Sequence, residues 1–389
     1  HLSDAFRRAY FARWLSAACG ESEVLRSFQG YAWEEIRRRF QELDEQLQKQ
    51  AVIATFEAVS ASLPDPLPAS ERTVLVREAR KKRRHLPLRK LFPLIPRLLL
   101  AVKPCLMMSP LSVATYLPRD LFQFDLVIFD EASQLPPGDA VGVLLRGKQA
   151  VIFGDNKQLP PTDFFRAHAE GEEDEPDAQD YESILDIASV YFPGPMLRWH
   201  YRSRDERLIG FSNRYVYDRK LITFPAPGTD GVETGVTFVH VPDGVFGKGG
   251  SRTNRAEAER VAQLVLEHFR TSRDLSLGVI TMSIEQRDAV EEALHRLRRA
   301  YPEVKVPDNF FVKNLETVQG DERDVIILSV GYGPSEPGGT PSLNFGPLSR
   351  VGGERRLNVA ITRARYRMIL VSSMTPEQLE SVVVRSKWD

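Results

Sequence analysis

Cysteine and long apolar runs are both scarce in this sequence. Only Cys19 and Cys105 occur among 389 residues, without a C-x-x-C pattern or enough nearby histidines for a zinc site. The most apolar stretch, 91–102, is interrupted by two prolines and an arginine and is shorter than the roughly 20 residues that span a bilayer. We therefore expect a cytoplasmic (intracellular) chain in a reducing compartment, with neither a signal peptide nor a transmembrane helix.

The chain also lacks an excess of charge of either sign, because 52 lysines and arginines offset 53 acids to give a net charge of −1. Any nucleic acid must therefore be held by local basic patches rather than by bulk attraction. The segment 77–90 is such a patch, with eight arginines and lysines against one acid. Its charges repel one another, so an anionic partner would relieve them, although a solvated surface is the alternative. The candidate nucleic-acid ligands in it are Lys81, Lys82, Arg83 and Arg84.

An apolar run, Leu126–Phe129, ends abruptly in two adjacent carboxylates, Asp130 and Glu131. The run is short and rich in β-branched and aromatic residues, which predicts a central parallel strand buried on both faces. Ligands of open α/β sheets bind beyond the carboxyl ends of the strands. Two neighbouring acids repel unless a cation shares them, and a magnesium nucleotide would supply that cation. A strand followed by a helix-capping acid is the alternative, but it explains only one carboxylate.

A second apolar strand, Ala150–Phe153, runs into the segment 154–161, which reads Gly-Asp-Asn-Lys-Gln-Leu-Pro-Pro. Gly154 permits a tight turn after the strand, and the Gln158 amide can orient a water molecule or contact a γ-phosphate. A proline-terminated surface turn is the alternative. Together, the two stretches resemble motifs II and III of superfamily 1 helicases.

The segment 197–203, Leu-Arg-Trp-His-Tyr-Arg-Ser, resembles the His/Gln-Tyr-Arg motif of the helicase branch that contains the RNA-surveillance and replication-fork enzymes. This resemblance assigns Arg202 to the γ-phosphate and Tyr201 to the base. Further along, Gln-Gly-Asp-Glu at 319–322 resembles the core of motif V. Glu322 suits ribose hydroxyls, and Gly320 permits close approach of the backbone.

The segment 353–365 predicts a helix with apolar residues inward and with Arg356 and Arg363 two turns apart on one face. It closely resembles motif VI, which gives Arg363 the role of an arginine finger. An exposed basic helix is the alternative. The motifs follow the family order over positions 105–371.

Four further candidates for nucleic-acid contact come from the resemblance. The segment 103–113 predicts a short strand leading into a turn at Ser109 and Ser112, where relatives carry a backbone-contacting loop; a plain helix cap is the alternative. Thr281 lies in a predicted strand over 277–283, where relatives usually show Thr-Pro. Asn314 stands where relatives carry a Thr or Ser.

Helix-face spacing of aromatic and apolar residues predicts helices over 1–63, with the aromatic stripe in a core. The proline cluster 64–68 ends this region, and the acidic segment 170–180 predicts a surface loop. We therefore predict a helical accessory region over 1–68, the remainder of a first RecA-like domain over 69–194, and a second RecA-like domain over 195–389.

No Gly-x-x-x-x-Gly-Lys-Ser/Thr phosphate loop occurs in the sequence, and the nearest approach, 244–249, lacks the hydroxyl residue and the strand-to-helix context. In the family this loop lies upstream of motif II. We therefore expect a fragment whose loop precedes His1 in a longer protein. The helices over 1–63 would be an accessory insertion, and the chain alone would be inactive.

These patterns predict an α/β protein with two RecA-like domains and parallel sheets. The resemblance implies an ATP-dependent, magnesium-dependent helicase or translocase on single-stranded DNA or RNA, moving five-prime to three-prime, with no membrane partner and a monomer favoured. Asp130 would hold Mg²⁺ through water, Glu131 would activate the attacking water, and Gln158, Arg202 and Arg363 would act on the phosphates. The alternatives are a nucleic-acid-binding module without ATP turnover and the motor part of a nuclease or defence protein.

Overall fold

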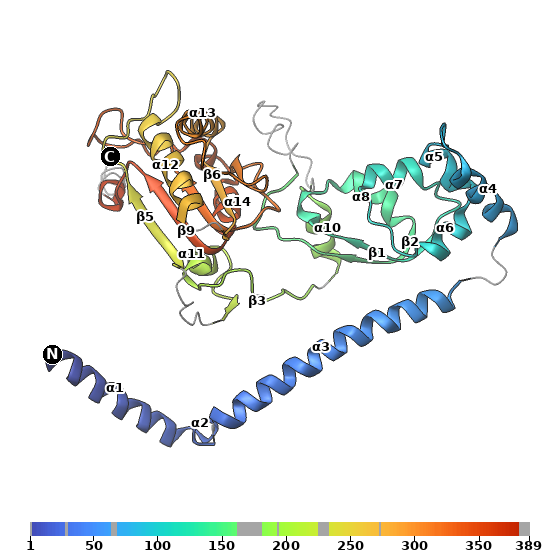
Figure 1. Ribbon diagram of the computed structural model, residues 1–389, viewed down its shortest axis with the longest axis horizontal. Helices are drawn as coiled ribbons and strands as arrows, with labels where there is room; N and C mark the ends of the chain where they lie inside the picture. The colour runs from blue at the N-terminus through green and yellow to red at the C-terminus, as the bar shows by residue number, and fades with distance from the viewer. Residues whose placement is uncertain are drawn as a thin grey trace. The chain divides into compact units, whose positions relative to one another are not determined.

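The computed structural model divides the chain into two compact units, residues 1–123 and 124–389, which are described separately (Figure 1). The structure describes residues 2–27, 30–63, 68–161, 181–192, 194–224, 233–271 and 274–380. The acidic segment 170–180 and most of the proline cluster, 64–67, lie outside the described residues. The predicted domain boundaries at 68 and 194 stay predictions.

The helices predicted at the start of the chain are confirmed as α1 (Leu2–Glu21), α2 (Glu23–Arg26) and α3 (Gly30–Ala61). The prediction that their aromatic stripe forms a core is wrong, because neither α1 nor α3 has a buried residue. Trp14 is 61% exposed and Phe40 is 68% exposed. An amphipathic pattern marks a face that can be buried but supplies no partner for it. Local charge pairs support α3 instead, as where Arg38 bonds Glu35 and Glu42 one turn away on either side.

The remainder of the first unit consists of short helices: α4 (Ala69–Arg80), α5 (Leu88–Leu91), η1 (Phe92–Leu94), α6 (Pro96–Val102) and α7 (Pro110–Tyr116). The Glu71 carboxylate of α4 accepts the Leu98 N–H in the first turn of α6 at 2.8 Å, which ties the two helices together. The strand predicted within 103–113 is wrong. Residues 103–109 have no regular structure, and Pro110, with its preset φ, begins α7 behind the cap Ser109.

The two strands predicted to carry the carboxylates and the glutamine loop are confirmed as β1 (Phe124–Phe129) and β2 (Gly147–Ile152), which pair in parallel. They are connected through η2 (Ala132–Gln134) and α8 (Pro137–Leu144). The prediction that β1 is buried on both faces is wrong, because Leu126 is 45% exposed and Ile128 59% exposed. Phe129, on the other face, packs with Ala140 of α8 and Ile184 of α10 (Ile184–Tyr191). In the described part of the chain, no apolar cluster covers Leu126 and Ile128.

A five-stranded, wholly parallel sheet in the order β5-β9-β8-β6-β7 forms the centre of the second unit. Its strands are β5 (Gly235–His240), β6 (Leu277–Thr281), β7 (Phe311–Asn314), β8 (Arg323–Ser329) and β9 (Ala364–Ser372). Around it lie α11 (Arg207–Tyr215), α12 (Arg255–Thr271), α13 (Ile284–Ala300), η3 (Gly346–Ser349) and α14 (Gly353–Ile361). Strands β3 (Trp199–His200) and β4 (Ile222–Thr223) form a separate parallel pair. The predicted α/β class with parallel sheets is confirmed.

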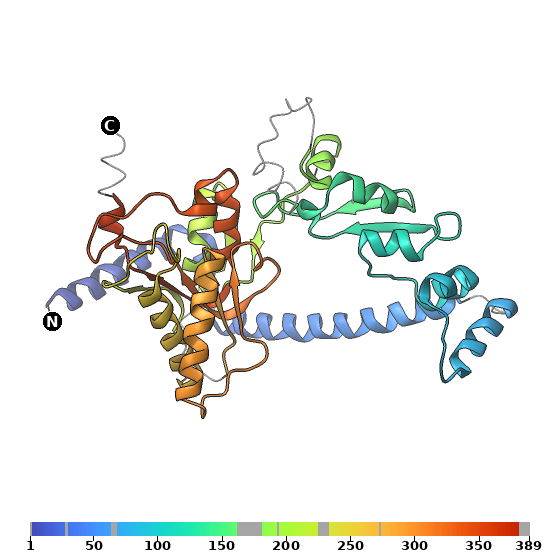
Figure 2. The ribbon, with the colours of Figure 1, turned by 90° about the horizontal axis from the view of Figure 1, so that it is seen from above.

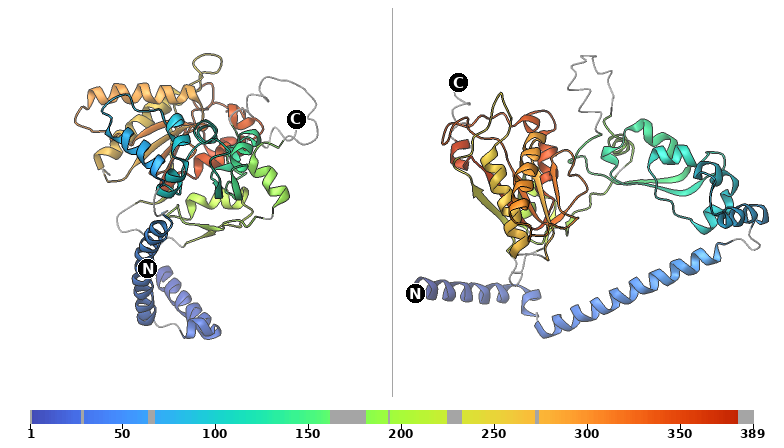
Figure 3. Two further views of the ribbon diagram at one scale, coloured as in Figure 1. Left: turned by 90° about the vertical axis from the view of Figure 1, so that its right-hand side faces the viewer. Right: turned by 45° about the horizontal axis from the view of Figure 1, so that its top comes forward.

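Strand β8 shows how this sheet is buried on both faces. Ile327 points into a cluster with Val261 of α12 and Val290 of α13, whereas Ile326 points into the opposite cluster with Val359 of α14. Helices α12 and α13 lie side by side over the first face (Figures 2 and 3). Covering both faces is the usual arrangement for parallel sheets, and it explains why β8 is apolar without alternation.

Helix α14 is shorter than the predicted helix over 353–365. It ends at Ile361, and β9 begins at Ala364. The prediction that Arg356 and Arg363 share one helical face is therefore wrong, because Arg363 lies in the short connection between α14 and β9.

Among the described helices, none combines the length and apolarity of a membrane span.

Candidate nucleotide-binding site

Asp130 and Glu131 directly follow β1, as predicted. Glu131 has a left-handed backbone with φ of 51°, which is uncommon for a residue with a side chain. The turn is held by Asp130, whose Oδ1 accepts the Glu131 N–H at 2.9 Å, and by the Ala132 N–H, which bonds the Phe153 carbonyl at 2.9 Å. The chain therefore leaves the strand in a fixed direction, with two carboxylates at its carboxyl end.

The loop after β2 begins at Gly154, where the reason for glycine is space. A Cβ there would lie 2.9 Å from the Leu185 side chain and 3.0 Å from the Ser133 nitrogen, so a larger residue would push η2 and α10 away. The loop is then organised by Asp155. Its Oδ1 accepts the Lys157 N–H and its Oδ2 accepts a hydrogen bond from Gln158 Nε2, both at 2.9 Å.

Two hydrogen bonds between side chains join these β1 and β2 loops to the segments that resemble motifs V and VI. Gln319 Nε2 donates to Glu131 Oε2 at 3.3 Å. Arg363 Nη2 donates to Gln158 Oε1 at 3.1 Å. Three of the four predicted catalytic side chains, Glu131, Gln158 and Arg363, therefore take part in bonds that join the two halves of the predicted site.

Arg363 is almost fully buried. Its Nε donates to the Val359 carbonyl of α14 at 2.7 Å. Burial, followed by the nearby charge of Arg202, lowers the pKa of Arg363 to about 10, so the side chain stays cationic at neutral pH. A buried cation held by one carbonyl and one amide retains unused donors for an anion, because a guanidinium has five N–H groups.

Arg202 and Glu322, predicted to bind different parts of a nucleotide, are bonded to each other here. Arg202 Nε donates to Glu322 Oε2 at 2.7 Å. Tyr201, beside Arg202, is 81% exposed and can offer its ring to a base. Gly320 has φ of 86°, a conformation that favours glycine, and nothing lies within 4 Å of a Cβ built on it. The arrangement leaves the ring and the glycine accessible, while the bond to Glu322 holds Arg202 through its Nε.

The sequence reasoning missed two residues of this cluster, Tyr217 and Asn358. The Tyr217 hydroxyl donates to Asp155 Oδ2 at 2.6 Å and accepts from Asn358 Nδ2 at 3.0 Å. Asn358 Nδ2 also donates to the Lys157 carbonyl at 2.9 Å. Asn358 lies inside the motif VI segment and could have been chosen for its polar side chain among apolar neighbours. Tyr217 carries no such signal, since tyrosines are common in loops.

The candidate nucleic-acid residues are spread over both units. Thr281 and Asn314 are buried at the ends of β6 and β7, where Thr281 donates to the Ser283 carbonyl at 2.8 Å and Asn314 accepts the Thr317 hydroxyl at 2.6 Å. Ser109 caps α7 by accepting the Ser112 N–H at 3.3 Å. The helix cap that was the alternative interpretation of this turn is therefore present.

In the basic segment, Lys81 pairs with the buried Glu78 of α4, while Lys82, Arg83 and Arg84 are exposed. Arg84 has φ of 57°. Three of the four predicted cations are therefore available to an anion, and their contact with nucleic acid stays a prediction.

Magnesium was predicted at Asp130, and the residues present fit that ion when it arrives with phosphates. In the part of the chain that the structure describes, no three His, Cys, Asp or Glu side chains gather into a protein-only metal cage. Magnesium rarely uses one, since it keeps several waters and takes one or two carboxylates plus substrate phosphates. Asp130 and Glu131 supply that number of carboxylates. Beside them, Gln319 Oε1 is buried without a hydrogen-bond partner and can accept a bond from a water molecule.

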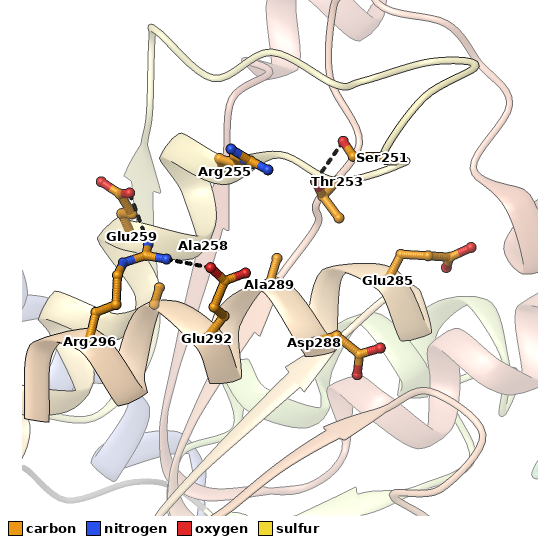
Figure 4. A pocket seen from close by; sticks show the side chains of 11 residues that line it. Ser251, Thr253, Arg255, Ala258, Glu259, Glu285, Asp288, Ala289, Glu292 and Arg296 are labelled. Carbon is orange, nitrogen blue, oxygen red and sulfur yellow. Dashed lines mark hydrogen bonds and ion pairs between the residues drawn. The ribbon is translucent and has the colours of Figure 1, made fainter.

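A pocket of about 490 Å³ lies elsewhere, between α12, α13 and the loop before α12 (Figure 4). Its lining includes Ala258 and Ala289 together with side chains of both signs of charge. Arg296 bonds Glu259 and Glu292 across it. Glu285 and Asp288, which also line it, pair with Arg252 and Arg287 outside the lining.

The fold and the gathered motif residues place the chain among the helicases. A family model described as an AAA domain matches residues 186–375. The chain is 37% identical, over 69% of its length, to an uncharacterised ATP-dependent helicase of Mycoplasma genitalium, and 26% identical, over 64%, to a regulator of nonsense transcripts 1 homologue of Neurospora crassa. It is also 26% identical, over 64%, to the DNA replication ATP-dependent helicase/nuclease of Gallus gallus. The chain belongs to the superfamily 1 helicases.

The matched region is a minor part of each relative. It covers 24% of the Mycoplasma protein and 23% of each of the other two. The chain therefore spans about a quarter of the length of these curated relatives.

Proposed function

We propose that the chain is the motor core of an ATP-dependent helicase or translocase that hydrolyses ATP between two RecA-like domains and moves along single-stranded nucleic acid. The observation that supports this most is the pair of hydrogen bonds Gln319–Glu131 and Arg363–Gln158. They join the strand-end carboxylate and amide to the segments resembling motifs V and VI. Helicase relatives named as ATP-dependent support the use of ATP.

In this proposal each side chain acts on a defined part of the reaction. Glu131 orients and deprotonates the attacking water, and Gln158 senses the γ-phosphate through its amide. Arg202 and Arg363 neutralise charge that develops on the transferred phosphoryl group, which is worth roughly 10³- to 10⁵-fold in rate for such arginines. Bound magnesium, held through Asp130, would neutralise charge on the phosphates.

Glu322 and Tyr201 hold the nucleoside in this proposal. The Glu322 carboxylate bonds ribose hydroxyls, and Tyr201 stacks on the base, which leaves Arg202 free to turn towards the γ-phosphate. Gly320 lets the backbone approach the sugar. The Arg202–Glu322 pair therefore opens when the nucleotide binds, because each partner then has a ligand of its own.

These 389 residues alone are proposed not to turn over ATP at a useful rate. A phosphate loop encloses the β- and γ-phosphates with backbone N–H groups, a lysine and a hydroxyl, and no stretch of the sequence has that pattern. Steady-state phosphate release with single-stranded DNA and RNA tests this. Turnover by the bare chain that Glu131→Gln stops would contradict it.

The test of the main proposal is Glu131→Gln in a helicase that contains these residues together with a phosphate loop. The amide keeps the shape and loses the basicity, so ATP binding should persist while turnover is abolished. The matched control is Glu303→Gln, an exposed acid that pairs with Arg270 away from the site. Near-normal hydrolysis by the Glu131 variant would remove Glu131 from its role.

For the strand itself, we propose that Lys82, Arg83 and Arg84 contribute affinity without sequence preference. Replacing all three by alanine should weaken single-strand binding and flatten its dependence on salt, by about 0.7 in slope for each phosphate that the segment no longer neutralises. An unchanged salt slope would make the segment a solvated surface.

A further inference from the structure

Asp155 is the centre of a hydrogen-bond network that reaches the second half of the site by two routes. Through Gln158, whose Nε2 bonds Asp155 Oδ2, it reaches Arg363. Through Tyr217, whose hydroxyl bonds the same Oδ2 at 2.6 Å, it reaches Asn358 of α14. Since Arg363 Nε also bonds the Val359 carbonyl of α14, the two routes meet on the same helix.

The direction of each bond determines what the network can hold. Asp155, when ionised, only accepts, so Gln158 must present its NH₂ to Asp155 and its carbonyl oxygen to Arg363. Tyr217 must donate to Asp155, because the carboxylate has no proton to give. Burial and the Asp155 charge raise the pKa of Tyr217 well above its usual range, so the hydroxyl keeps its proton at any physiological pH.

We infer that Tyr217 is a positioning residue for ATP hydrolysis: by fixing Asp155 on one side and Asn358 on the other, it orients the Gln158 amide towards Arg363. This inference rests on the proposed function, since Gln158 and Arg363 are its phosphate-sensing and finger residues. Tyr217 itself bonds neither of the carboxylates proposed to serve magnesium and water. Instead, Tyr217 determines the angle at which the Gln158 amide and the Arg363 guanidinium face the γ-phosphate.

The chemistry of these bonds explains why a hydroxyl is needed at this position. Asp155 Oδ2 accepts two bonds, and without the Tyr217 hydroxyl it retains only the one from Gln158. The Asn358 amide would be left with the Lys157 carbonyl as its acceptor. The carboxylate could then rotate and take the Gln158 amide with it, so the arginine and the amide would no longer be held face to face.

The experiment compares Tyr217→Phe with Tyr215→Phe in a helicase that contains these residues and a phosphate loop. Both variants remove one hydroxyl, but Tyr215 is an exposed residue of α11 that contacts the Phe211 ring and the Arg214 guanidinium. We expect Tyr217→Phe to lower kcat about tenfold or more with little change in the KM for ATP, because a bond to a charged group is removed while the phosphate ligands remain. Tyr215→Phe should leave kcat unchanged.

A double variant separates positioning from a structural role. If Tyr217 acts through the glutamine, Tyr217→Phe should cost almost nothing further in a Gln158→Ala background. Independent, multiplying losses would overturn the inference. So would a wild-type kcat for Tyr217→Phe, or a fall in kcat matched by a large loss of thermal stability.

Glu131→Gln, measured alongside, keeps the two proposals distinguishable. If it abolishes turnover while Tyr217→Phe does not lower kcat, the proposed function stands and the positioning role fails. If the Glu131→Gln variant hydrolyses ATP at the normal rate, the proposed function fails, and the positioning role that rests on it fails with it.

Discussion

Helices α3 and α12 show the same kind of amphipathic sequence pattern with opposite outcomes. In α12 the apolar face, including Val261 and Val265, is fully buried against the five-stranded sheet. In α3 the corresponding face, including Ile36 and Phe40, is exposed along its length. The difference lies in the partner: α12 packs on a sheet within an α/β unit, whereas α3 is a 32-residue helix outside any sheet. Periodicity therefore predicts the element, and only the neighbouring topology decides whether its face contributes to stability.

The largest expected loss of stability comes from truncating an apolar side chain, and it should differ between the buried and the exposed face. Ile327→Ala in β8 should destabilise the second unit by roughly 2 to 5 kcal/mol, because it deletes buried methyl groups and leaves a cavity between β8 and α12. Ile36→Ala, the same change on the exposed stripe of α3, should stay within about 0.5 kcal/mol. Urea unfolding monitored by circular dichroism measures both. Equal losses would mean that the α3 stripe is buried in solution.

The next effect concerns a buried acid of α12, Glu257. Its Oε1 accepts bonds from the Ser329 hydroxyl at 2.8 Å and the Gly331 N–H at 2.7 Å, and burial raises its pKa to about 8. The unfolded carboxyl titrates near 4.5, so between 4.5 and 8 the folded state binds more protons than the unfolded state. Stability should therefore fall as pH rises through this window, by at most about 1.4 kcal/mol per pH unit from this group.

Thermal unfolding from about pH 5 to about pH 8 measures this slope, and Glu257→Gln should flatten it because the amide does not titrate. The control is Glu45→Gln on the exposed surface of α3, where Glu45 pairs with Lys49. If the stability of the Glu257→Gln variant depends on pH as steeply as that of the wild type, the Glu257 carboxyl of the wild type is ionised in the folded state.

The smallest expected effects come from replacing glycine by alanine. This substitution should destabilise the five-stranded sheet and stabilise the N-terminal helices. A Cβ on Gly278 of β6 would lie 2.5 Å from the Phe311 ring, so Gly278→Ala should cost about 1 to 3 kcal/mol through overpacking. Nothing lies within 4 Å of a Cβ on Gly20 of α1. Gly20→Ala should therefore raise helix stability by roughly 0.5 to 1 kcal/mol, because alanine loses less backbone entropy. Helicity and melting temperature distinguish these outcomes.

Much of the second unit could be predicted from the sequence. Strands β1 and β2 were expected from their apolar runs and α14 from its spacing, because these elements follow rules of local periodicity. The exposure of β1 could not be predicted, since Leu126 and Ile128 are apolar regardless of what covers them. Local sequence also gave no sign that α14 ends before Arg363, where a helical pattern and a following strand overlap.

For the site, the resemblance to motifs supplied residue identities but not their partners. Glu131, Gln158 and Arg363 were expected from their segments, yet the Arg202–Glu322 pair was not, because nothing in either motif shows that the two side chains meet. Tyr217 depends on a contact across 62 positions of sequence, from Asp155 in the β2 loop. Such long-range contacts follow from the fold and have no local pattern.

The strand order of the five-stranded sheet has a consequence for how the chain is made. Strand β5 pairs only with β9 in the described sheet, and more than a hundred residues separate Gly235 from its partner Arg367. During synthesis β5 therefore emerges from the ribosome long before its partner exists, with its N–H and C=O groups unpaired. Strands β6, β7 and β8 can associate earlier, but β9 must insert between β8 and β5 to complete the sheet. Helicase nascent chains of this topology should keep an open, chaperone-accessible edge until the final strand has been translated.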